Sequence, residues 1–196
     1  MENIEVLFIN GSPRKDGISM SLASYVMRSV EKEGGKVKTI HLIDNNIKWC
    51  EGCVSVSREE CNRERCRKLN DDVDKIFKIL LKADALVFVT PVYWYAPSGL
   101  LKNFIDRLTS LENEGKLLDG KIGGFVVTAQ EDGAMMTILS LMGTLNDMGI
   151  IFPPYAFTYS VGFEDVSKDK EAIEYAERLG KNIVRMGEML RNMRWL

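Results

Sequence analysis

Residues 4–22 read IEVLFINGSPRKDGISMSL, an apolar run followed by a Gly-Ser-Pro-Arg turn and a stretch rich in hydroxyl residues. The run predicts a buried strand, and the residues after the turn predict the first turn of an amphipathic helix. A strand that ends in a tight turn at a helix N-terminus presents free backbone N–H groups and a positive dipole to an anion. The spacing matches neither GxGxxG nor GxxxxGK[ST], so a monophosphate fits this turn better than a dinucleotide or a nucleoside triphosphate.

Side chains suited to a phosphate surround this turn. Gly11 lets the backbone approach a ligand closely. The hydroxyls of Ser12, Ser19 and Ser21 can donate hydrogen bonds, and the Arg14 guanidinium is a fork that matches phosphate oxygens. The alternative is an ordinary strand–helix turn with a serine N-cap.

The composition is that of an ordinary globular chain. It has 196 residues, is 45% hydrophobic and carries a net charge of −2 from 26 basic and 28 acidic residues. This length suits one domain, which we expect to span residues 1–196. The near-neutral charge gives no reason to expect nucleic acid or an anionic membrane surface as a partner. Because the sequence shows no membrane-length apolar run and no signal peptide, we expect a cytoplasmic protein.

Apolar runs alternate with helical periodicities along the rest of the chain. After the first strand, strands are expected at 37–42, 85–90, 122–128 and 155–161, and a last helix from about 169 into the 190s. The helix after the fourth strand is expected to bury Met135, Ile138, Leu139, Met142 and Leu145. This alternation predicts an α/β fold: a flavodoxin-like, doubly wound, five-stranded parallel sheet in the order 2-1-3-4-5, with helices on both faces. Such a sheet binds ligands at the carboxyl ends of its first and third strands.

An aromatic segment, TPVYWYAPSG at 90–99, follows the expected third strand. Three consecutive aromatic residues, Tyr93, Trp94 and Tyr95, are costly to expose, and a planar aromatic ligand would give them a stacking partner. Packing on the next helix or at a subunit contact is the alternative. The polar turn TAQEDG at 128–133 reaches the same edge of the sheet, where its amides and Gln130 could bond the polar edge of a ring, although a plain turn explains it too.

Two motifs resemble those of a known family. GSPR at 11–14 with Gly17, Ser19 and Leu22, and PVYWYAPSGLLKNFIDRL at 91–108, are similar to the NADPH-dependent FMN reductase and iron-sulfur flavoprotein family, over residues 4 to about 160. The resemblance implies a flavodoxin-like fold, FMN as cofactor and a homodimer or homotetramer. By motif position it assigns the FMN phosphate to Ser12, Arg14, Ser19 and Ser21, and it counts Met20 among the cofactor-binding residues. It assigns the isoalloxazine ring to Pro91, Val92, Tyr93, Trp94 and Tyr95, and the pyrimidine side of that ring to Thr128, Ala129, Gln130, Asp132 and Gly133. Ile18 departs from the family, which commonly has Asn there.

The four cysteines, Cys50, Cys53, Cys61 and Cys66, all fall in a loop expected over 49–70. In a cytoplasmic chain such clustering indicates metal or redox chemistry, and four thiolates can hold a 4Fe-4S cluster or a zinc ion. The iron-sulfur flavoproteins carry a compact cysteine motif at this position, but here seven residues separate the second cysteine from the third, where that family usually has the third two residues after the second. An iron-sulfur cluster, zinc, and free or disulfide-paired cysteines all remain open.

Basic residues and the histidine bear on what the four cysteines hold. The basic residues of this loop are expected to offset the negative charge of a thiolate-bound cluster: Arg58, Arg63, Arg65, Arg67 and Lys68. His41, the only histidine, is expected to be structural, which argues against a mixed Cys/His zinc site and against Ser-His-Asp catalysis.

We therefore expect an enzyme, an FMN-dependent NAD(P)H oxidoreductase. Hydride passes from reduced nicotinamide to flavin when the two rings stack, so no catalytic side chain is required. The expected acceptor is a quinone, a flavin or, through a cluster, a ferredoxin-like protein. The alternative is a non-enzymatic electron carrier of flavodoxin type; such carriers tend to be strongly acidic for docking, and this chain is not. A regulatory or scaffold protein on the same fold is a third possibility.

Overall fold

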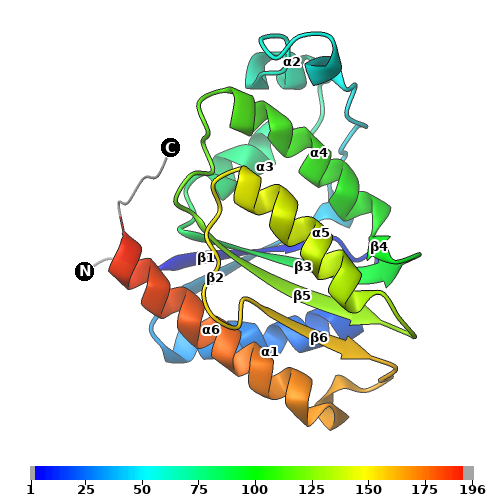
Figure 1. Ribbon diagram of the computed structural model, residues 1–196, viewed down its shortest axis with the longest axis vertical. Coiled ribbons are helices and arrows are strands. Elements are labelled where there is room, and N and C mark those ends of the chain that lie inside the picture. Colours follow the sequence, from blue (N-terminus) through cyan, green and yellow to red (C-terminus); the bar gives the residue numbers. More distant parts are fainter. Residues whose placement is uncertain (1–2, 192–196) are drawn as a thin grey trace.

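The computed structural model describes residues 3–191 and shows one central sheet with helices on both faces (Figure 1). The strands are β1 Glu5–Asn10, β2 Lys36–His41, β3 Ala85–Tyr93, β4 Ala96–Pro97, β5 Ile122–Ala129 and β6 Phe157–Val161. The helices are α1 Ile18–Lys32, α2 Arg63–Lys68, α3 Val73–Leu80, α4 Gly99–Asn113, α5 Ala134–Asp147 and α6 Lys170–Leu190. Single 3₁₀ turns lie at Leu42–Asp44, Cys53–Ser55 and Val166–Lys168.

The sheet confirms the prediction of a doubly wound parallel fold and corrects the strand count. Five strands pair in parallel in the order β2-β1-β3-β5-β6, and the two-residue β4 pairs antiparallel with β3. The predicted order 2-1-3-4-5 contains no such strand, because a segment between two prolines is typical of a loop. The chain instead reverses at Trp94 and Tyr95, so that Tyr93 pairs with Ala96.

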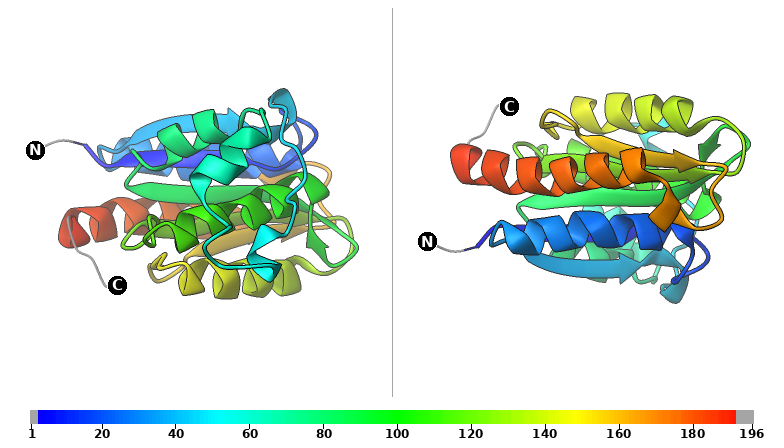
Figure 2. Two further views of the ribbon diagram at one scale, coloured as in Figure 1. Left: turned by 90° about the horizontal axis from the view of Figure 1, so that it is seen from above. Right: turned by 90° about the horizontal axis from the view of Figure 1, so that it is seen from below.

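Two apolar layers enclose the sheet. On one face α1 and α6 cover alternate residues of β1 and β3, such as Val6, Phe8 and Val87. On the other face α3, α4 and α5 cover the residues between them, such as Leu7 and Phe88. The two views of Figure 2 show these helical layers on opposite sides of the sheet. Since β3 is buried on both faces from Ala85 to Thr90, the prediction of a fully buried third strand is confirmed.

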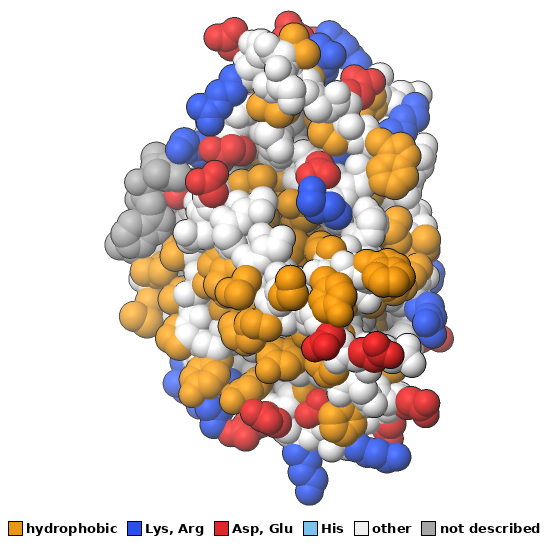
Figure 3. Space-filling model, turned by 45° about the vertical axis from the view of Figure 1, so that its right-hand side comes forward, with side chains coloured by type: hydrophobic (Ala, Val, Ile, Leu, Met, Phe, Trp, Pro, Cys, Tyr) orange, Lys and Arg blue, Asp and Glu red, His pale blue; other side chains and the backbone are white. Residues whose placement is uncertain are grey.

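The orientation of α5 differs from the expectation. Its buried side consists of Ala134, Thr137, Ile138, Leu141 and Leu145. Met135 and Leu139, which were expected inside, are exposed, the latter to 60%. Apolar residues occupy all sides of this helix, so periodicity alone cannot identify its inner face. An apolar surface therefore remains over α5, visible in the centre of Figure 3.

The last helix was expected to continue into the 190s. It ends at Leu190, and residues 192–196 lie outside the described part of the chain. Among residues 3–191, none of the helices has both the length and the apolarity needed to span a membrane.

Candidate functional site

A pocket opens at the carboxyl ends of the parallel strands. These strand ends lie near β4 in Figure 1. We call the pocket the strand-end pocket. Its walls come from the loop after β1 and the start of α1, from the last residues of β3 and β5, and from the turns after β5 and β6: Ser12, Arg14, Gly17, Ile18, Ser19, Pro91, Val92, Tyr93, Thr128, Ala129, Gln130, Glu131, Gly162, Phe163 and Glu164. The pocket thus brings the three segments predicted from sequence together.

The first turn of α1 forms one end of the strand-end pocket. Gly17 is the N-cap residue in an extended conformation, and no side chain caps the helix. The first turn carries no acidic residue. Within the described chain Arg14, which lines the pocket, forms no ion pair, and its side chain is exposed. Free N–H groups, the helix dipole and an unpaired guanidinium together favour an anion here.

Hydrogen bonds within the loop hold Ser12 in place. The Ser12 N–H donates to Asn10 Oδ1 at 2.9 Å, and Ser12 Oγ accepts from the Arg14 N–H at 3.1 Å. The Asn10 amide nitrogen lies 2.9 Å from His41 Nδ1. His41 therefore supports the loop through Asn10, in agreement with a structural role.

Helix α4 packs directly against this loop. A Cβ atom on Gly11 would lie 2.5 Å from the Leu101 Cβ, so only glycine fits. Ser98 Oγ donates to the Gly11 carbonyl at 2.5 Å and accepts from the Leu101 N–H at 3.2 Å, which caps α4 and ties it to the loop. Sequence reasoning missed this role of Ser98, although its position before a helical periodicity is a recognisable N-cap signal.

The last residues of β3 and β5 form another part of the wall of the strand-end pocket. The Ser19 and Thr128 hydroxyls, both buried, lie 2.5 Å apart and join the start of α1 to the end of β5. Sequence reasoning also missed the wall made by Gly162, Phe163 and Glu164. The topology rule that identified the other walls applies equally to this segment, because it follows the last parallel strand.

Six residues predicted to contact a cofactor do not line this pocket: Met20, Ser21, Trp94, Tyr95, Asp132 and Gly133. Met20 packs on the core between α1 and α6, and Ser21 and Asp132 are exposed. Gly133 precedes α5 at φ 89°, where a Cβ atom would lie 2.9 Å from the Tyr95 Cα. Their role in cofactor contact stays a prediction.

Trp94 and Tyr95 form the tip of the β3–β4 hairpin. Their φ angles of 50° and 62° make a two-residue turn of the type that usually contains Asn-Gly. Bulky residues in this left-handed region cost roughly 1–2 kcal/mol each. Trp94 is 94% exposed. The fold therefore holds two rings outward at an energetic cost.

The cysteines meet in a second pocket, which we call the cysteine pocket. It is lined by Cys50, Glu51, Cys53, Cys61, Arg65, Cys66, Leu69, Asp106 and Arg107. All four cysteines are free, and Cys53 and Cys61 are buried. Burial, together with the neighbouring Cys53 and Cys66 thiols, raises the pKa of Cys61 to about 12. A metal that binds here must displace thiol protons.

The arrangement of the thiols bears on which metal group they could hold. Among residues 3–191, no three His, Cys, Asp or Glu side chains are placed to hold a metal ion together. Ligands of one zinc ion crowd around a single centre at about 2.3 Å. Such a centre is not formed among the described residues, although all four cysteines line one pocket.

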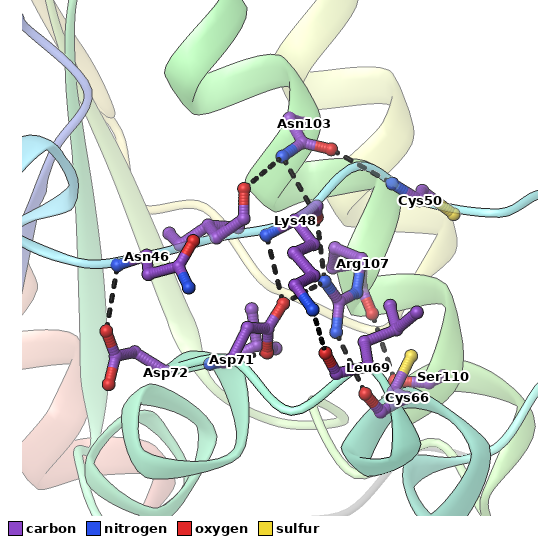
Figure 4. A network of polar contacts seen from close by, with 12 residues as sticks. Asn46, Lys48, Cys50, Cys66, Leu69, Asp71, Asp72, Asn103, Arg107 and Ser110 are labelled. Atoms are coloured by element: carbon purple, nitrogen blue, oxygen red, sulfur yellow. Dashed lines mark hydrogen bonds and ion pairs between the residues drawn. The ribbon is translucent and has the colours of Figure 1, made fainter.

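Helix α4 holds the cysteine pocket through Asn103 and Arg107, which lie one turn apart (Figure 4). The Cys50 N–H donates to Asn103 Oδ1 at 3.1 Å. Arg107 Nη1 donates to Lys48 O at 2.8 Å and to Asp71 Oδ2 at 2.6 Å, and Nη2 donates to Cys66 O at 3.2 Å. Both charged side chains are almost fully buried. Burial alone would lower the pKa of Arg107, but Asp71 and Cys66 outweigh it and raise that pKa.

The basic residues of the cysteine loop lie mostly in ion pairs, and their expected effect on the charge of a cluster stays a prediction. Four of them form ion pairs with carboxylates: Arg63 and Arg67 with Asp74, Arg65 with Glu60, and Lys68 with Glu64. Arg107, from a different part of the chain, is instead the buried cation at this pocket. A charged residue between Phe104 and Leu108, on the apolar side of a helix, is the sequence signal that could have identified it.

Comparison with known proteins agrees with the geometry. The model of the NADPH-dependent FMN reductase family matches residues 4–164. An iron-sulfur flavoprotein of Archaeoglobus fulgidus is 31% identical, over 97% of this chain and 99% of the relative. One of Methanocaldococcus jannaschii is 28% identical, over 96% of this chain and 100% of the relative. The crystal structure of RosB with a bound 8-demethyl-8-formylriboflavin-5'-phosphate intermediate shares the fold, with a TM-score of 0.78 at 18% identity over 98% of this chain and 82% of that one. The chain belongs to the NADPH-dependent FMN reductase family, and its curated relatives include iron-sulfur flavoproteins.

Proposed function

We propose that this protein is an FMN-dependent oxidoreductase and that FMN binds in the strand-end pocket. One observation carries the proposal: an uncapped helix N-terminus and an unpaired Arg14 line the same pocket as Pro91–Tyr93 and the 128–131 turn. The helix start suits a phosphate, and the other two wall segments suit a planar ring with a polar edge. Ser12, Arg14 and Ser19 would hold the phosphate, and the two turns would orient the ring.

The four cysteines complete the proposal. Their thiolates would hold a 4Fe-4S cluster. The curated relatives are named iron-sulfur flavoproteins, and those names give no cluster type. The four-thiolate donor set of the cysteine pocket supports this assignment. Cys53 and Cys61 are buried, and Cys50 and Cys66 are partly exposed.

Bound FMN would transfer electrons between a donor and an acceptor in the same pocket. The residues of the chain would bind and orient the reactants, so no side chain needs to act as acid or base. NAD(P)H is the proposed donor. A quinone, a free flavin or, by way of the cluster, a ferredoxin-like protein is the proposed acceptor.

Anaerobic purification tests these assignments together. The protein should carry FMN and about four irons per chain, with broad absorbance beneath the flavin bands. Steady-state oxidation of NADH or NADPH with a quinone should then show turnover. A flavin-loaded protein that exchanges electrons only with a protein partner, without turnover, would instead be a carrier. A colourless protein that takes up no FMN would contradict the proposal.

We also propose that a second copy of this chain covers the apolar surface over α5 (Figure 3). This surface includes Met135, Met136 and Leu139, and residues 134–146 contain no charged side chain. Contact with Gly133 places Tyr95, and the hairpin tip with it, beside the start of α5. A charge-free apolar face can meet its own copy across a two-fold axis without repulsion. Light scattering should therefore give a mass of at least two chains.

A further inference from the structure

Arg107 is better connected than any other charged side chain beside the cysteine pocket, yet its hydrogen bonding is incomplete. Its guanidinium is 1% exposed and donates to Lys48 O, Asp71 Oδ2 and Cys66 O. Its Nε is buried and has no acceptor within the described chain. A buried donor without a partner costs about 1–3 kcal/mol, and more when it is charged. Because buried donors in native proteins are almost always hydrogen-bonded, we expect an acceptor next to Arg107 Nε.

The surroundings of Arg107 indicate what that acceptor is. Arg107 lines the cysteine pocket, and its Nη2 already reaches the backbone of Cys66. A guanidinium presents Nε–H and one Nη2–H side by side as a fork. Asp71, the buried carboxylate, is engaged at Nη1, on the other side of the group. The Nε–H is therefore the donor that stays unengaged on a side chain that lines the cysteine pocket.

We infer that Arg107 donates its Nε–H to a sulfur of the group held by the four cysteines, with the Cys66 thiolate as the first candidate. The inference rests on the proposed function, because it requires a thiolate-bound cluster. Hydrogen bonds to cluster sulfurs stabilise the reduced, more negative state and so raise the reduction potential. Arg107 is then a positioning residue: it orients Cys66 and tunes the cluster, and it does not touch the substrate.

Two variants separate the hydrogen bond from the charge. Arg107→Lys keeps a cation near Asp71 but has no Nε–H. The double variant Arg107→Gln/Asp71→Asn removes the buried pair as a whole, so that the net charge is unchanged and no buried charge is left alone. Lys102→Ala is the matched control. It removes a cation from α4 whose side chain is 56% exposed and bonds only Asp106.

The experiment is an EPR-monitored potentiometric titration of the full chain, loaded anaerobically with ferrous iron and sulfide. We expect equal iron in all four proteins, a lower midpoint potential in both Arg107 variants and the wild-type potential in Lys102→Ala. In addition, pulsed EPR of reduced wild-type protein labelled with ¹⁵N-arginine should detect one coupled nitrogen. That signal does not require any variant to fold.

The outcomes separate this inference from the proposed function. Iron at wild-type level with an unchanged potential in both Arg107 variants would show that Arg107 only supports the fold. Absence of a coupled arginine nitrogen in the iron-loaded wild type would overturn the inference as well. A wild-type protein that takes up no iron would overturn the cluster itself, and this role of Arg107 with it.

Discussion

The strand-end pocket and the cysteine pocket are built by different means. The first is walled by the carboxyl ends of parallel strands and the turns that follow them, so the register of the sheet places its walls. The second lies in a stretch without strands, 42–72, and is held by side chains of α4 that bond to backbone groups. The shape of the first pocket therefore depends on the whole sheet, whereas a few hydrogen bonds hold the second pocket in place. Single substitutions should be able to disable one pocket and spare the other.

Cysteine substitution should separate the two pockets most completely. Replacing any one of Cys50, Cys53, Cys61 and Cys66 by serine should remove most of the iron while FMN stays bound, because the phosphate loop lies on other strands. Iron analysis and the visible spectrum measure both cofactors in one sample. Ser55→Ala, in the same segment, is the control. Stoichiometric zinc would favour the zinc alternative, and four titratable thiols without metal would favour free cysteines.

Asp71→Ala should destabilise the protein by about 3–5 kcal/mol, because it leaves the buried charge of Arg107 without its partner. Urea unfolding measures this change. Lys102→Ala, which breaks the exposed Lys102–Asp106 pair on the same helix, should cost about 0.2–1 kcal/mol. Under native conditions the FMN dissociation constant of Asp71→Ala should match that of the wild type. A weaker FMN affinity would mean that the two pockets are coupled.

Arg14→Ala should weaken FMN binding and leave the iron content unchanged. Loss of a charge-assisted hydrogen bond to phosphate should weaken FMN binding by about 1.5–3 kcal/mol. This corresponds to a rise of roughly 10- to 150-fold in the dissociation constant, measured by fluorescence titration. Lys15→Ala is a matched control, since its side chain is exposed and pairs with Asp44. An unchanged constant in Arg14→Ala would remove the phosphate from this loop.

Substitutions at the hairpin tip test whether Trp94 and Tyr95 belong to the strand-end pocket. Trp94→Asn with Tyr95→Gly restores the residues that a turn of this type prefers, so the hairpin should persist without its rings. If these rings belong to the self-contact surface, the mass in light scattering should fall while FMN affinity changes by less than about threefold. A clear loss of FMN affinity would instead support the sequence-based prediction that both rings contact the flavin.

The smallest expected effect is a pH dependence of the network around the cysteine pocket. Burial alone would raise the pKa of Asp71, but hydrogen bonds from Arg107 and from the Val73 and Lys48 N–H groups lower it below its ordinary value of 3.8. A lowered carboxyl pKa stabilises the fold above the unfolded-state value, and this stabilisation disappears as the pH falls through the folded-state pKa. Unfolding free energies measured between pH 3 and pH 6 should therefore drop more steeply in the wild type than in Asp71→Asn.

Local sequence patterns were sufficient for the fold and for most of the strand-end pocket. A buried strand, a glycine turn and a helix start are encoded by neighbouring residues, and the topology rule converts them into one edge of a sheet. Nine of the fifteen residues predicted to bind the cofactor line that pocket. The others, such as Ser21 and Trp94, lie in the right segments but point elsewhere, because segment position does not determine side-chain direction.

The cysteine pocket could be predicted only as a set of ligands. Its supporting contacts join residues far apart in the chain, such as Arg107 with Asp71 and Asn103 with Cys50, and no local pattern specifies such pairs. The short β4 and the outward face of α5 were missed for related reasons. A two-residue strand exists only through its pairing with β3, and an apolar helix shows its inner side only once it is packed.

Helix α4 has a consequence for how this chain can vary. Ser98 bonds the loop of the strand-end pocket at the start of the helix, and Arg107 bonds the cysteine pocket further along it. Since a helix rises about 1.5 Å per residue, it spaces these two anchor points by roughly 13 Å along its axis. Each residue also turns the helix by about 100°. Inserting or deleting one residue between the anchors would rotate Arg107 away from Cys66 without changing any residue of either pocket. The two contacts therefore constrain the number of residues between Ser98 and Arg107 more than the identity of those residues.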